Sequence, residues 1–141
     1  EMIKTAKLDI AFIPEPVASM GELSGLKKLI SITDDGGFMP EAMVFTSKAL
    51  EEKSEAIQLF VDGYNKAVED ISKDEALARD ALIREIKLKP EIKDMIVLAE
   101  YKKARVPSEE YINKIIDWVE KVQEIDVELN YEDMVEGNFT E

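Results

Sequence analysis

The chain has 141 residues, a length typical of one domain, and 45% of its residues are apolar and 35% charged, which is enough apolar material for a core. Its formal net charge of −13 disfavours binding to nucleic acid or to an anionic membrane surface, because like charges repel. Cysteine and histidine are both absent, which excludes thiolate chemistry and removes the commonest general base and metal ligand. We therefore predict a protein that is not an enzyme and that uses no metal and no cofactor.

The first part of the chain carries signals of strands and turns. Leu8 to Ile13 is a nearly continuous apolar run, as expected for a strand buried on both faces. Pro16 suits the first turn of a short helix that ends at the following glycines. Two more strands are predicted at Leu26 to Ile32 and Ala42 to Thr46, joined by a loop over residues 33–37. This alternation predicts an α/β fold class with a few-stranded sheet.

From Ser47, a predicted N-cap, the pattern is helical. Between Ser54 and Ser72 the apolar residues recur at spacings of three and four, which predicts one amphipathic helix. These residues are Ile57, Phe60, Val61, Tyr64, Ala67, Val68 and Ile71. Asp74 can cap a second helix, and Pro90 can open a third that extends to Ala99.

The last part of the chain begins with an extended segment from Tyr101 to Val106, because the following proline disfavours helix before it. Ser108 can cap the next helix, which has an apolar stripe and two acidic residues in its first turn. Asn130 can cap a final short helix, with Gly137 behind it as a stop. From Glu120 onward there are eight acidic residues and one basic residue, a pattern typical of a solvated surface.

Two segments are candidates for ligand binding. The turn formed by Pro14, Glu15 and Pro16 joins the first strand to a helix N-terminus, where backbone N–H groups and the Glu15 carboxylate can meet a ligand. Alternatively, Glu15 complements the helix dipole at the surface. In the second segment, Gly37 lets the backbone approach a ligand and Phe38 can stack on a planar ring. Alternatively, this segment is a connecting loop with Phe38 in the core.

Four segments resemble a known family of solute-binding proteins. Lys7 to Pro16 resembles the strand and Glu-Pro turn of the nitrate/sulfonate/taurine and thiamine-precursor type, with Lys7 where glycine is common. Pro40 to Ser47 resembles the strand before the family's long helix, and Ile57 to Ile71 resembles that helix. Leu129 to Val135 resembles the family's closing segment. The four segments occur in the family's order.

The resemblance implies a type II periplasmic-binding fold, in which two lobes close around a ligand. It implies that residues 1–47 form the α/β part of the second lobe, and that residues 48–141 complete this lobe and return towards the first. The amino-terminal half of the family fold is expected to be absent. Pro14, Glu15 and Pro16 would lie at the cleft edge.

The implied function is the capture of a small nutrient for the permease of an ABC importer. The protein is expected outside the cytoplasm, either in the periplasm or lipid-anchored at the cell surface. Acidic residues at the cleft, Glu15 and the candidates Asp34 and Glu41, suit an amine-bearing or heteroaromatic ligand such as a thiamine precursor. Nitrate or a sulfonate fits less well, because the arginines lie in helical or linker stretches away from the candidate cleft. These are Arg79, Arg84 and Arg105.

Two other functions were weighed. A thiamine-pyrimidine synthase of the same fold uses histidine and iron, and the absence of histidine disfavours it. A free-standing helical interaction module would use residues 8–46 as an arm, bind no small molecule and stay monomeric. If the chain is instead half of a solute-binding protein, we predict that it self-associates through open strand edges and apolar helix faces.

Overall fold

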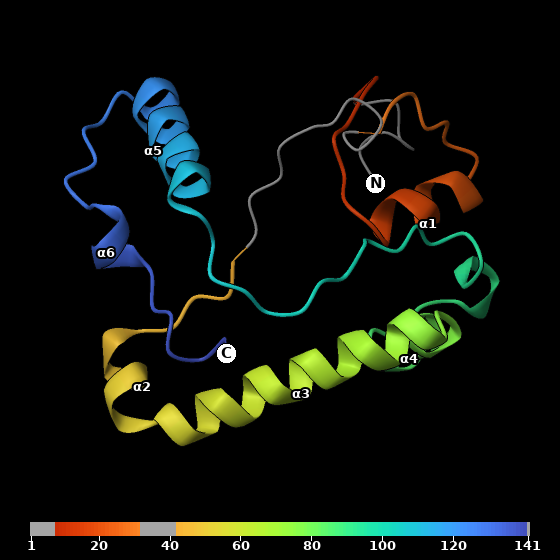
Figure 1. Cartoon of the computed structure of the whole chain (residues 1–141). Helices are drawn as coiled ribbons and strands as arrows, with labels where there is room; N and C mark the ends of the chain where they lie inside the picture. The colour runs from red at the N-terminus through yellow and green to blue at the C-terminus, as the bar shows by residue number, and fades with distance from the viewer. Residues whose placement is uncertain (1–7, 32–41, 141) are drawn as a thin grey trace. The chain divides into compact units, whose positions relative to one another are not determined.

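The computed structural model describes residues 8–31 and 42–140, and Figure 1 shows its helices. Within those ranges the chain forms six α-helices and one short 3-10 helix. They are α1 (Val17–Leu23), α2 (Ser47–Glu52), α3 (Ser54–Lys73), α4 (Ala76–Glu85), η2 (Pro90–Ile92), α5 (Glu109–Gln123) and α6 (Tyr131–Met134). The same ranges contain no β-strand, so the predicted α/β fold class is wrong and the described part of the chain is all-helical.

The three segments predicted as strands lack the backbone pairing that defines a strand. Residues 8–13, 26–31 and 42–46 form no ladder with any described neighbour. Several of their apolar side chains are open to solvent: Leu29 is 76% exposed and Val44 is 86% exposed. An apolar run marks a segment with a tendency to be buried, but an extended chain becomes a strand only when a neighbour supplies hydrogen bonds.

Side-chain caps start three of the six described α-helices, and the predicted cap of α4 at Asp74 is wrong because its N-cap is Glu75, with no side-chain cap. Ser108 caps α5 by accepting from the Tyr111 N–H at 3.2 Å, as predicted. The Asn130 side chain accepts from the Asp133 N–H, and the Asp133 carboxylate accepts from the Asn130 N–H. The two residues therefore form a capping box at the start of α6. The N-cap of α2 is Thr46 and not the predicted Ser47. The α6 helix ends at Met134, before the predicted stop at Gly137.

The helix predicted from Pro90 to Ala99 is wrong. Only the single turn of η2 forms, and the backbone after it turns and then runs on without helix. Ile92 and Ile96 are nevertheless both buried, which is the burial that the apolar spacing indicated. The carbonyls of Lys93 and Ile96 accept hydrogen bonds from the Arg79 side chain, so part of this backbone is satisfied without helical hydrogen bonds.

The chain divides into two compact units, each made of two stretches of sequence. Among the described residues, unit 1 contains 8–31 and 70–101, and unit 2 contains 42–69 and 102–140. The division passes through α3, between Glu69 and Asp70. The boundary at residue 47 that the composition indicates stays a prediction. No helix in the described ranges combines the length and the hydropathy needed to cross a bilayer.

Unit 1 is organised by contact of α1 with η2. Ile92, Ile96 and Ala78 are its buried apolar side chains, and Ser19 on α1 is fully buried. Gly21 allows a close approach, because a Cβ atom there would lie 3.3 Å from the Leu26 side chain.

Unit 2 contains most of α3, along which Ile57, Val61 and Val68 are buried. Two side chains of α3 hold the extended segment that follows residue 101. The Tyr64 hydroxyl donates to the Lys102 carbonyl at 2.9 Å, and the Asn65 side-chain oxygen accepts from the Ala104 N–H at 2.7 Å. Residues 101–107 form neither helix nor strand, and these two bonds fasten the segment to α3.

Candidate functional site

The turn formed by Pro14, Glu15 and Pro16 leads directly into α1. Pro14 is exposed, Glu15 and Pro16 are half-buried, and Pro16 is the N-cap of the helix. The Glu15 Oε2 atom accepts from the Ser19 N–H at 3.2 Å and lies 2.8 Å from the Ser19 hydroxyl. One carboxylate oxygen is therefore bonded to the first turn of the helix, as in the alternative in which Glu15 complements the helix dipole. The other oxygen, Oε1, has no partner among the described residues.

The first-turn N–H groups of α1 are used within the helix and turn. The N–H of Ala18 donates to the Pro14 carbonyl at 3.0 Å, and the N–H of Met20 donates to the Pro16 carbonyl at 3.1 Å. The Ser19 N–H bonds to Glu15. The expectation that these groups are free to bind a ligand is therefore wrong for all three. The polar group that the turn itself offers is the Glu15 carboxylate.

Ser19 connects the turn to a distant part of the sequence. Its side chain is fully buried, and its Oγ atom lies 3.1 Å from the carbonyl oxygen of Met95. Sequence analysis did not single out Ser19. A signal was present, because a serine four residues after a glutamate at a helix start can meet its carboxylate.

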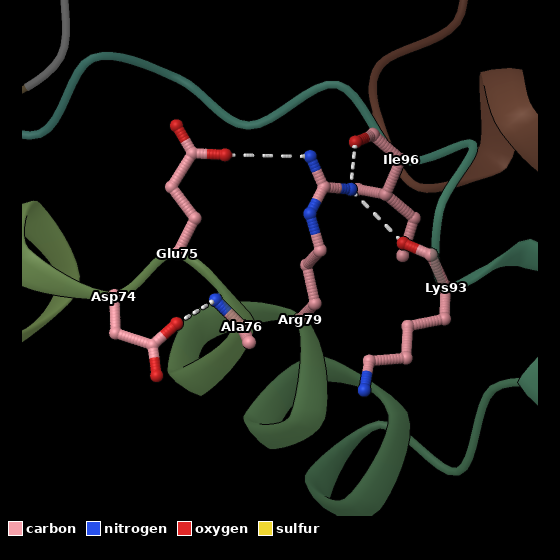
Figure 2. Close-up of polar contacts among 6 residues, drawn as sticks. All are labelled: Asp74, Glu75, Ala76, Arg79, Lys93 and Ile96. Atoms are coloured by element: carbon pink, nitrogen blue, oxygen red, sulfur yellow. Dashed lines mark hydrogen bonds and ion pairs between the residues drawn. The ribbon is translucent and has the colours of Figure 1, made fainter.

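Arg79 holds the segment that contains Met95. Figure 2 shows its side chain extending from α4 towards two backbone carbonyls. Its Nη1 atom donates to the Lys93 carbonyl at 2.9 Å and to the Ile96 carbonyl at 2.7 Å. Its Nη2 atom lies 3.6 Å from the Glu75 carboxylate. Sequence analysis placed Arg79 away from the ligand, and the structure gives it a structural role in unit 1.

A second side-chain contact fastens the same segment to α4. Lys93 forms an ion pair with Asp80, and the hydrogen bond that the ammonium donates to this carboxylate is the main cause of the raised pKa of Lys93. Because the lysine is at the surface, this pair is a weaker link than the Arg79 contacts. Together, the two side chains explain how a segment without regular structure keeps its position beside α4.

The structure describes only the first of the two predicted binding segments. Gly37 and Phe38 lie outside the described residues, as do Asp34 and Glu41. Within the described ranges, no three acidic side chains are grouped so that they could hold a metal ion.

Glu15, Ser19 and the Met95 carbonyl thus form one connected polar group in unit 1, supported by Arg79. Comparison of the chain with protein-family models, with curated proteins and with solved structures finds no match.

Proposed function

We propose that this chain serves in the extracytoplasmic solute-binding component of an ABC importer, which captures a small amine-bearing or heteroaromatic nutrient for its permease. One observation carries the proposal: Glu15 lies in a surface turn with one carboxylate oxygen that has no partner among residues 8–31 and 42–140, while a fully buried serine contacts the other. The four segments that resemble the family add support. Their order along the chain does not depend on whether the short apolar runs are strands.

The chemistry of this group suits capture and not reaction. A carboxylate accepts hydrogen bonds from an amine or an amino group, and partial burial strengthens such a bond relative to water. In this proposal the carboxylate in the turn accepts a hydrogen bond from a donor group of the nutrient, and the nutrient is released unchanged. A thiamine precursor with an aminopyrimidine ring offers such a donor, whereas nitrate and a simple alkanesulfonate offer only acceptors to a carboxylate.

A thermal-shift screen tests the proposed function. We expect an aminopyrimidine thiamine precursor to raise the Tm, and nitrate and methanesulfonate, which carry no N–H donor, to leave it unchanged. A free ligand concentration of a hundred times the Kd corresponds to a stabilisation of about 2.7 kcal/mol. The Glu15→Gln variant should lose most of this shift because it removes the charge of the acceptor.

The matched control is Glu22→Gln, which makes the same change in the last turn of α1 and should retain the ligand-induced shift. A screen in which no amine-bearing or heteroaromatic compound raises the Tm of the unchanged protein contradicts the proposed function. Equal loss of the shift in both variants contradicts the role given to Glu15.

A second candidate function, a helical protein-interaction module, is favoured by one observation. α5 is amphipathic, but none of its residues is fully buried, and Trp118 is 56% exposed. An apolar helix face of this kind can serve as a docking surface. This function predicts that no small molecule changes the Tm, so the same screen separates the two candidates.

For the solute-binding role we predict that this chain self-associates. Exposed apolar side chains in the extended segments, such as Leu29 and Val44, gain from burial against another copy. Repulsion from the net charge of −13 opposes this association, so added salt should promote it. Sedimentation velocity should show a mass that increases with protein concentration, and more strongly at high salt. A monomer at every concentration and at both salt levels contradicts the prediction.

A further inference from the structure

We propose that residues 124–129, between α5 and α6, form a docking edge for an extended partner peptide in which basic and apolar residues alternate. The inference goes beyond the proposed function and does not depend on ligand capture by Glu15, because Glu15 belongs to unit 1 and this segment to unit 2. Three features carry it: the order of the side chains, the unpaired backbone and the sign of the charge.

The order of the side chains is the first feature. Acidic and apolar residues alternate strictly along the segment, in the order Glu124, Ile125, Asp126, Val127, Glu128 and Leu129. A period of two places the apolar set on one face of an extended chain and the acidic set on the opposite face. Sequence analysis counted the acidic residues of this region but did not use their alternation.

The structure leaves much of the apolar face uncovered. Figure 1 shows the segment as the connection from α5 to α6, and residues 125–130 form no helix, turn, bend or strand. Ile125 is 52% exposed and Leu129 is 55% exposed, whereas Val127 between them is half-buried. A partner that covered the two ends of this face would therefore bury apolar surface that is now in contact with water.

The unpaired backbone is the second feature. The Val127 N–H donates to Oε1 of Glu120, on α5, at 3.0 Å. Successive N–H groups of an extended chain point to opposite sides, so those of Asp126 and Glu128 point away from this bond. The N–H and carbonyl groups of these two residues make no hydrogen bond to any described residue, and both residues are exposed. An open edge of this kind can pair with a strand through main-chain hydrogen bonds.

The sign of the charge is the third feature, and it selects the occupant. Residues that face each other in a ladder stabilise the pair when their charges are opposite and destabilise it when the charges are alike. Basic side chains opposite Asp126 and Glu128 therefore fit, with apolar side chains between them. A second copy of this segment would place the same acids opposite one another. The net charge of −13 also attracts a basic partner over longer distances.

A synthetic peptide tests the docking edge. The probe has four valines and three lysines in alternation, with blocked ends, and its control has the same residues in two blocks. NMR titration of the full chain should show the alternating peptide binding about tenfold more tightly, and N-methylation along its pairing edge should remove this advantage. Amide exchange should slow at Asp126 and Glu128 and change little at Val127, whose N–H is already bonded.

A double variant tests the charge. Asp126→Asn with Glu128→Gln should weaken binding of the alternating peptide by about fivefold. The matched control is Asp117→Asn with Glu132→Gln, which makes the same change at two other exposed residues of unit 2 and should weaken it by less than about twofold.

Four results would overturn the inference. They are no binding of the alternating peptide, equal affinity for the alternating and block peptides, unchanged exchange at Asp126 and Glu128 on binding, and equal weakening in the two double variants. Each of them leaves the proposed function standing, because that function is tested through Glu15 in unit 1.

Discussion

Replacing Ile92 by alanine is expected to lower the free energy of unfolding by about 3 kcal/mol. Ile92 is 0% exposed and is the last residue of η2, which packs against α1. The substitution removes buried methyl and methylene groups and leaves a cavity, because the surroundings relax only in part. Urea unfolding followed by far-UV circular dichroism measures the effect as a lower midpoint at an unchanged slope.

The control for this experiment is Ile86→Ala. It removes the same atoms in unit 1, but Ile86 is 53% exposed at the end of α4. We expect a loss of about 0.5 kcal/mol or less, as for other surface substitutions. Equal losses in the two variants would contradict the assignment of Ile92 to the core of unit 1.

Replacing Arg79 by methionine is expected to lower the free energy of unfolding by about 2 kcal/mol. The methionine retains much of the length of the side chain but removes the donor to the Lys93 and Ile96 carbonyls. Leaving these partly buried carbonyl groups without a partner costs more than the hydrogen bonds contribute. The ion pair with Glu75 adds little, because that glutamate is largely exposed.

Two measurements check the Arg79 prediction. Urea unfolding gives the overall loss, and hydrogen exchange should show faster exchange at the amides of residues 92–96. The control is Arg84→Met, because among the described residues the Arg84 side chain bonds only the adjacent, exposed Glu85, and this variant should change stability by less than about 0.5 kcal/mol. Unchanged exchange at residues 92–96 in Arg79→Met would show that the guanidinium does not hold that segment.

Two helix starts with local signals, and the amphipathic α3, were predicted correctly. The α5 and α6 helices start where Ser108 and Asn130 indicated, because a cap needs only a side chain and an N–H group a few residues away. The α3 helix was predicted from spacing alone, and the structure buries Ile57, Val61 and Val68 along one face. The caps act over a few residues, and the apolar spacing of α3 can be recognised in a window of about 11 to 18 residues, so a short stretch of sequence contains both signals.

The strands and the helix after Pro90 were predicted wrongly for a different reason. Their apolar spacing indicates a tendency to burial, and Ile92 and Ile96 are indeed buried. Spacing does not show where the backbone groups find partners, and the carbonyls of Lys93 and Ile96 find theirs in an arginine side chain. An extended segment likewise needs a neighbouring strand before it pairs, and a single sequence names no neighbour.

The sequence by itself determined where α5 and α6 begin, which faces of α3 and α5 are apolar, and that Glu15 follows a proline in a turn before α1. Only the tertiary structure decided the surroundings of that glutamate. Ser19 and the Met95 carbonyl are 76 residues apart along the chain, and they meet because α1 packs on η2. Contacts of this kind depend on how distant segments fold back on one another, and no local pattern of residues encodes them.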